Sequence, residues 1–203
     1  MRNENIMKLT LAGMFAAMAF VCFSYLRIEI PMGGGLTGKI YIGHAFIILS
    51  SLLLGAKYGA LSGAIGLTLA DILAGYTTSA PPTFVAKFIL GLAVAFVAHK
   101  MYHLTTEKDN KKISRIVLIA AIVSSLVNVI TEPLIRFGFK YFILGIPQQI
   151  AYLSAVNCAI SMAVSGVFSV ILTVFLYKAL EHGVLKNWKW KSSEVKTKFS
   201  VKL

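Results

Sequence analysis

The chain has 203 residues, of which 57% are hydrophobic and only 14% are charged, with a mean hydropathy of +0.77. A soluble domain is about 45–50% apolar and about 25% charged, so this composition argues against a soluble protein. The formal net charge of +12 would suggest a nucleic-acid-binding protein only if the chain were soluble.

Six hydrophobic segments approach the roughly 20 residues that a membrane-spanning helix needs. In chain order they cover residues 6–26, 40–54, 58–76, 82–102, 113–137 and 149–180. The sequence therefore predicts an all-α membrane protein with six transmembrane helices, in one domain over residues 1–185, followed by a basic cytoplasmic tail over 186–203. The first segment lacks a small-residue cleavage site, so we expect a spanning helix there and not a cleaved signal.

Basic residues are unevenly distributed between the two sides of this arrangement. With the N-terminus inside, the outer connections carry only Arg27, Lys39, Arg136 and Lys140. Apart from Lys87, which lies within a predicted span, all other lysines and arginines fall on the inner side. By the positive-inside rule, this distribution places both termini in the cytoplasm. The lysine-rich tail with its tryptophans is typical of a solvated or headgroup-facing segment, so we expect membrane lipids as partners and no nucleic acid.

The first outer connection, RIEIPMGGGLTGKIYIG, is the longest and has a strand-like start. Arg27 to Ile30 alternate between polar and apolar residues as a short strand does, and Pro31 with the following glycines breaks the pattern. The other outer connections, GYTTSAPP and RFGFKYFILGIPQQ, mix hydroxyl, aromatic and polar groups. These three loops either roof a common pocket or serve as plain connectors.

Two opposite charges, Asp71 and Lys87, lie in otherwise apolar segments. Each is four or five residues from the outer end of its helix, which places both roughly 6–8 Å below the outer loops at about 1.5 Å per residue. Because a buried charge needs a partner, the equal depth predicts an Asp71–Lys87 ion pair. Lys87 then either locks two helices together or points at a ligand.

A second polar stripe runs along the fifth predicted helix. Asn128, Glu132 and Arg136 are spaced by four residues and share one helix face. Glu132 and Arg136 either satisfy each other or form part of a functional site, since ionisable groups inside a membrane are functional candidates.

The outer halves of the third to sixth helices bring the candidate ligand-binding residues to one level. A cavity there would have apolar walls with a few polar groups, which suits a small polar organic molecule. Other roles are open for some of these residues. Phe84 and Phe88 could pack against lipid or the core, Asn157 could form an interhelical hydrogen bond, and His44 could lie at the membrane interface. The predicted substrate-binding residues are His44, Tyr76, Phe84, Lys87, Phe88, Asn128, Glu132, Arg136, Gln149, Tyr152 and Asn157.

Motifs of known chemistry give no support for an enzyme. The sequence has no nucleophile–base constellation, phosphate-binding loop, zinc-protease motif or haem signature. Cys22 and Cys158 lie in predicted spans without metal-ligand spacing. We therefore expect no catalytic activity, metal or cofactor, and no ATP site in this chain.

Small residues form a seam on the first predicted helix. Ala12 and Ala16 are four residues apart, as are Gly13 and Ala17. Such spacing lets a second helix approach closely in lipid. That helix belongs either to this chain or to a partner subunit.

The stretch from residue 40 to 91 carries the most specific motifs: LLLGAKYGALSG at an inner turn, LADILAGY at a helix end and APPTFVAK at a helix start. With the Ala12–Ala16 pair, these motifs resemble the substrate-binding S components of energy-coupling factor (ECF) vitamin transporters over most of the chain. Lys87, Glu132 and Asn157 fall where similar sequences have polar residues. His44 and Ser161 depart from the residues that similar sequences often have.

The resemblance implies a multi-pass subunit of the bacterial plasma membrane that binds a water-soluble vitamin or vitamin precursor on its outer side. It also implies that Ala12 and Ala16 contact a transmembrane coupling subunit, which carries two ATPase subunits. Pantothenate would suit Lys87 and Arg136, whereas a pyridoxine-type or hydroxymethylpyrimidine substrate would suit Glu132. The alternatives are a stand-alone secondary transporter or channel that uses Asp71, Lys87 and Glu132, and a membrane enzyme or structural protein.

Overall fold

The structure is a computed structural model of the chain, and it describes residues 2–32, 36–105, 107 and 109–180. The basic tail predicted over 186–203 lies outside the described residues. Helix α1 (Arg2–Tyr25) leads into strands β1 (Arg27–Met32) and β2 (Leu36–Tyr41), which pair antiparallel. Four long helices follow, with short helical turns at their ends: α2 (His44–Leu73), η2 (Thr77–Ser79), α3 (Ala80–Ala95), η3 (Phe96–Met101), α4 (Asn110–Gly138), η4 (Phe139–Ile143) and α5 (Gln148–Leu180).

Helix α2 is a pair of antiparallel helical segments that turn at Gly55. Gly55 has φ 77° and ψ −172°, a backbone conformation that a helix cannot contain and that glycine adopts readily. A Cβ atom at Gly59 would overlap the backbone of Ser51, and one at Gly63 would overlap the side chain of Ile47. Contacts between residues equally far before and after the turn show that the two segments lie against each other.

These two segments correspond to the second and third helices expected from the sequence. The predicted start of the former at residue 40 is wrong, because Ile40 and Tyr41 belong to β2 and the helix begins at His44. Strand β1 begins at Arg27, where the sequence predicts a strand-like start, but it continues through Pro31, at which the sequence predicts a break. Within the described residues, five helices are long and apolar enough to cross a membrane, with the whole of α2 counted as one.

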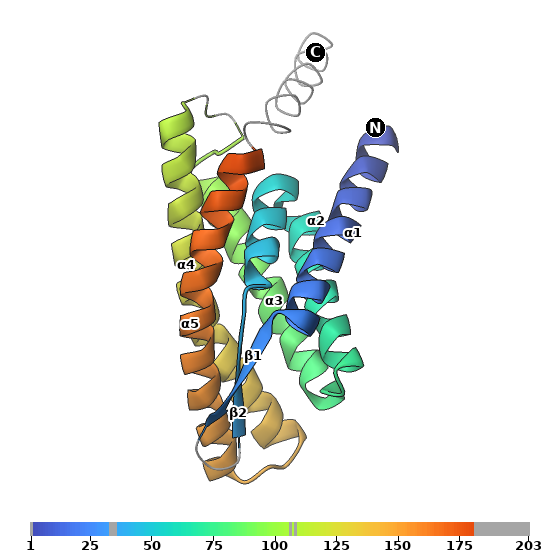
Figure 1. Cartoon of the computed structure of the whole chain (residues 1–203), viewed down its shortest axis with the longest axis vertical. Coiled ribbons are helices and arrows are strands. Elements are labelled where there is room, and N and C mark those ends of the chain that lie inside the picture. The colour runs from blue at the N-terminus through green and yellow to red at the C-terminus, as the bar shows by residue number, and fades with distance from the viewer. Residues whose placement is uncertain (1, 33–35, 106, 108, 181–203) are drawn as a thin grey trace.

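The connections of the chain gather at two opposite ends of the molecule. The start of α1 and the end of α5 lie at one end, while the strand hairpin runs toward the other end, where α4 and α5 are also joined (Figure 1). Strand β2 packs along α5, and α2 contacts α1, α3 and α5. The prolines at the start of α3 fit there because the first turn of a helix has no internal partner for their missing N–H groups.

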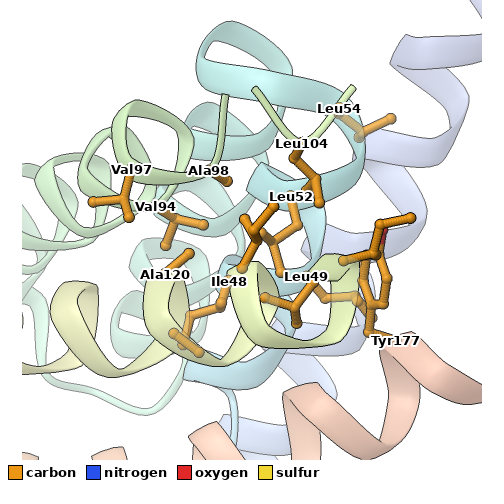
Figure 2. Close-up of a cluster of buried hydrophobic side chains, with 14 of the residues drawn as sticks. Ile48, Leu49, Leu52, Leu54, Val94, Val97, Ala98, Leu104, Ala120 and Tyr177 are labelled. Carbon is orange, nitrogen blue, oxygen red and sulfur yellow. The ribbon is translucent and has the colours of Figure 1, made fainter. Parts of the chain in front are cut away.

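A hydrophobic core fills the half of the bundle nearest the termini. Leu49 and Leu52 of α2 converge with Val94 of α3, Ala120 of α4 and Tyr177 of α5 (Figure 2). Many large apolar side chains on the outer faces of the helices are exposed instead. Apolar side chains on both the inside and the outside are typical of a protein surrounded by lipid.

Candidate functional site

A polar cavity of about 320 Å³ lies at the hairpin end of the bundle, between β2 and the ends of α2, α4 and α5. Each of the three connections at this end contributes to its wall: Lys39 from the hairpin, Tyr76 and Ser79 from the α2–α3 connection, and Lys140 from η4. Its full lining consists of Phe23, Thr37, Gly38, Lys39, Tyr41, Asp71, Tyr76, Ser79, Arg136, Lys140, Ser154, Asn157, Cys158, Ser161 and Met162.

Lys39 crosses from β2 to the α2 side of the cavity. Its Nζ lies 4.0 Å from Oδ1 of Asp71 and 2.9 Å from the ring centroid of Tyr76. Burial lowers the pKa of Lys39 to about 8, although the nearby carboxylate of Asp71 opposes this effect. The hydroxyl of Tyr76 donates a 2.9 Å hydrogen bond to Glu29 on β1, and this bond raises the pKa of Tyr76. The hairpin is therefore tied to the α2–α3 connection by charge and hydrogen bonds.

A chain of polar contacts continues from Asp71 across three helices. The hydroxyl of Thr83 donates to Oδ2 of Asp71 at 2.6 Å and accepts from Nη2 of Arg136 at 2.9 Å. The guanidinium of Arg136 also donates to Oε1 of Glu132 at 3.0 and 3.1 Å. Glu132 is fully buried, whereas Arg136 lines the cavity. The buried carboxylate therefore holds the guanidinium of Arg136 at the cavity wall.

Lys87 lies behind the cavity wall and is fully buried. Its Nζ forms an ion pair with Oε2 of Glu132 and lies 2.7 Å from Nε2 of His44 and 3.4 Å from Oδ1 of Asn128. The sulfur of Met162, a residue of the cavity wall, is 3.8 Å away. Lys87 thus supports the wall from α3 without being part of it.

The comparisons with known proteins identify the family of the chain and a similar fold. The family model described as "ECF-type riboflavin transporter, S component" matches residues 3–182. The chain belongs to this family. It is similar to a solved S component of a bacterial ECF transporter, with a TM-score of 0.56 and 21% identity over 90% of this chain and 98% of the other. A comparison with curated protein sequences finds no match.

As a member of this family, the protein is a membrane-embedded substrate-binding subunit of a transporter. The family resemblance expected from the sequence is therefore confirmed. The vitamin in the family's description, riboflavin, is not among the three substrates that the resemblance suggested.

The ion pair predicted between Asp71 and Lys87 of this S component is wrong. Asp71 pairs with Lys39 and Lys87 pairs with Glu132. Asp71 meets α3 at Thr83, one helical turn before Lys87, so equal distance from the helix ends does not bring the two charges together. Thr83 and Arg136 occupy the space between the two pairs.

The predicted substrate-binding residues fall into three groups. Tyr76, Arg136 and Asn157 line the cavity. His44, Lys87, Asn128 and Glu132 form the buried polar network behind it. The others are absent from the lining: Phe84 and Phe88 stack on each other at 6.2 Å and are half-buried, and Gln149 and Tyr152 are exposed.

Several cavity residues escaped the sequence analysis. Lys39 lies in a predicted loop and Tyr41 in a predicted helix start, so neither was chosen. Lys39 was nevertheless one of few basic residues on the outer side. Lys140 belongs to the same small set of outer basic residues. The scarcity of basic residues on this side was the signal that could have marked both lysines as candidates. Cys158 and Met162 looked like ordinary residues of a spanning helix.

The small-residue seam of α1 packs mainly inside the S component itself. Ala12 is buried in the hydrophobic core, so the partner contact predicted for it is not available in this structure. Ala16 is half-buried, and a Cβ atom at Gly66 of α2 would overlap its carbonyl oxygen. The exposed side of α1 carries Gly13 and Ala17 instead.

Proposed function

We propose that this S component captures a water-soluble vitamin or vitamin precursor in the cavity under the hairpin. The observation that carries this proposal is the convergence of all three connections of the hairpin end on one polar cavity. A membrane-embedded subunit with a polar cavity at one end is suited to take a small solute from one side of the membrane. The family's described substrate adds riboflavin to the candidates pantothenate, pyridoxine-type compounds and hydroxymethylpyrimidine.

The cavity faces the exterior of a bacterial plasma membrane. The two segments of α2 each form one span, which gives six transmembrane spans. Both termini are then cytoplasmic. Basic residues at the end opposite the cavity support this orientation, because Lys57, Lys100, Lys111 and Lys112 lie near the turns and connection of that end.

ATP hydrolysis in partner subunits energises release and uptake. A transmembrane coupling subunit approaches the exposed side of α1, where Gly13 and Ala17 allow close helix packing and half-buried Ala16 lies beside them. Two ATPase subunits bind the coupling subunit. The family membership supports such an assembly, since S components serve ECF transporters.

The test is uptake of labelled vitamins into proteoliposomes that contain the S component with or without its coupling module. We expect uptake only when the module and ATP are both present. Ala17→Trp should reduce co-purification of the coupling subunit while vitamin binding to the isolated S component stays intact. ATP-independent uptake by the S component alone would contradict the proposal.

The stand-alone transporter that uses Asp71, Lys87 and Glu132 as ion relays gains no support from the geometry. Lys87 and Glu132 are fully buried and paired with each other, and Asp71 is engaged by Lys39 and Thr83.

A further inference from the structure

The polar groups in and behind the cavity carry unequal charge. Four cations contribute, Lys39, Lys87, Arg136 and Lys140, against the two carboxylates of Asp71 and Glu132. Arg27 and Glu29 lie nearby on β1 but pair with each other at 3.1 Å, so they leave this difference unchanged. The site therefore holds an excess of two positive charges.

This excess is concentrated on the α4–α5 side of the cavity. Glu132 serves two cations at once, Lys87 and Arg136, and so neutralises only one of them. Lys140 donates a hydrogen bond to the hydroxyl of Ser154, and among the described residues no carboxylate forms an ion pair with it. Two positive charges in a half-buried cavity repel each other and favour a counter-charge.

A neutral hydrogen-bond donor faces the same part of the cavity. Asn157 lines the wall, and its Nδ2 is buried without a hydrogen-bond partner among the described residues. A buried donor left unpaired is unfavourable, so its partner is expected to arrive with the ligand. Arg136, Lys140 and Asn157 all offer N–H groups, and of these the Nδ2 of Asn157 has no acceptor among the described residues.

We infer that the substrate of this S component carries an anionic group, a carboxylate or a phosphate ester, that binds between Arg136, Lys140 and Asn157. This inference rests on the proposed function and narrows its substrate class. The rest of the molecule lies toward β2, where Tyr41 and Tyr76 line the opposite part of the wall. A neutral vitamin would leave both excess charges without a counter-charge inside the protein.

The test compares anionic and neutral members of matched pairs in binding to the purified S component in lipid-free detergent at constant ionic strength. The probes are pantothenate against panthenol, riboflavin 5′-phosphate against riboflavin, and pyridoxal 5′-phosphate against pyridoxal. We expect the anionic member of at least one pair to bind about tenfold more tightly, as hydrogen bonds from charged donors predict. Lys140→Met should remove most of this preference, Lys140→Arg should retain it, and Lys112→Met, an exposed lysine at the other end, should leave it unchanged.

Equal or tighter binding of the neutral members, or no binding by any anionic probe, would overturn the inference. So would an anion preference that Lys140→Met leaves intact. ATP-dependent uptake of a neutral vitamin by the complete transporter would refute the anionic substrate and still uphold the proposed function. A phospholipid identified by mass spectrometry as the tightly retained molecule would keep the anion site but contradict the vitamin substrate.

Discussion

Lys87 of α3 and Glu132 of α4 form an ion pair in which neither side chain reaches the surface of the protein. Glu132 also accepts two hydrogen bonds from Arg136, so one carboxylate compensates two cations. This arrangement makes Glu132 the central charge of the site, and it predicts an unequal effect of removing either partner.

Glu132→Gln should destabilise the protein more than Lys87→Met does. Removing the carboxylate leaves both Lys87 and Arg136 uncompensated, whereas removing Lys87 leaves Glu132 paired with Arg136. We expect Lys87→Met to lower the free energy of unfolding by about 3 kcal/mol, the lower end of the range for a broken buried pair, and Glu132→Gln by more. Thermal unfolding in detergent measures the order, with Lys112→Met as the control. A smaller loss for Glu132→Gln than for Lys87→Met would refute the shared role of Glu132.

Double-mutant cycles should separate the observed ion pairs from the one that equal depth suggests. Lys87→Met and Glu132→Gln should show a coupling energy above about 1 kcal/mol, because the two side chains are in direct contact. Asp71→Asn and Lys87→Met should show a smaller coupling energy than the direct pair, since the two residues are linked only through Thr83, Arg136 and Glu132. A coupling energy between Asp71 and Lys87 as large as that between Lys87 and Glu132 would show that they interact directly.

Substrate binding should weaken as the pH rises through about 8, the pKa to which burial lowers Lys39. Loss of its proton removes a positive charge from the cavity and the attraction to Asp71. Lys39→Arg should hold affinity up to at least pH 9, because a guanidinium stays protonated. The measurement is the affinity for the vitamin at a series of pH values, in the unmodified protein and in Lys39→Arg. Parallel pH profiles of the two proteins would exclude Lys39 as the titrating group.

The same group affects folding with the opposite sign. Between about 8 and the ordinary lysine value of 10.5, the unfolded chain binds more protons at Lys39 than the folded protein does. The contribution of Lys39 to the free energy of unfolding therefore rises with pH in this window. Binding and stability should thus change in opposite directions, which distinguishes titration of Lys39 from general unfolding at high pH.

Much of the fold was predictable because the bilayer sets the length of apolar segments and glycine marks their turns. The spans, the strand at Arg27 and the turn at Gly55 all left local signals of this kind. The pairing of charges was not predictable, because it depends on the direction of each side chain around its helix and on contributions from other segments. Lys39 on β2 reaches Asp71, which is 32 residues away in sequence, and no local pattern encodes that contact.

Helix α1 should depend on Gly66 for its packing against α2. A side chain at Gly66 would overlap the carbonyl oxygen of Ala16, so even Gly66→Ala should separate the helices and lower the unfolding temperature. Gly13→Ala is the matched control, because a Cβ atom there meets nothing within 4 Å. Equal stability of the two variants would show that α1 is not held at this contact.

The position of the bound vitamin tests the account most directly. An experimental structure of the purified S component with its vitamin should show the ligand under the β1–β2 hairpin, in contact with Arg136 and Asn157 and separated from Lys87 by Met162. Ligand density between other helices, or on the α1 face, with the hairpin cavity filled by protein side chains, would contradict it.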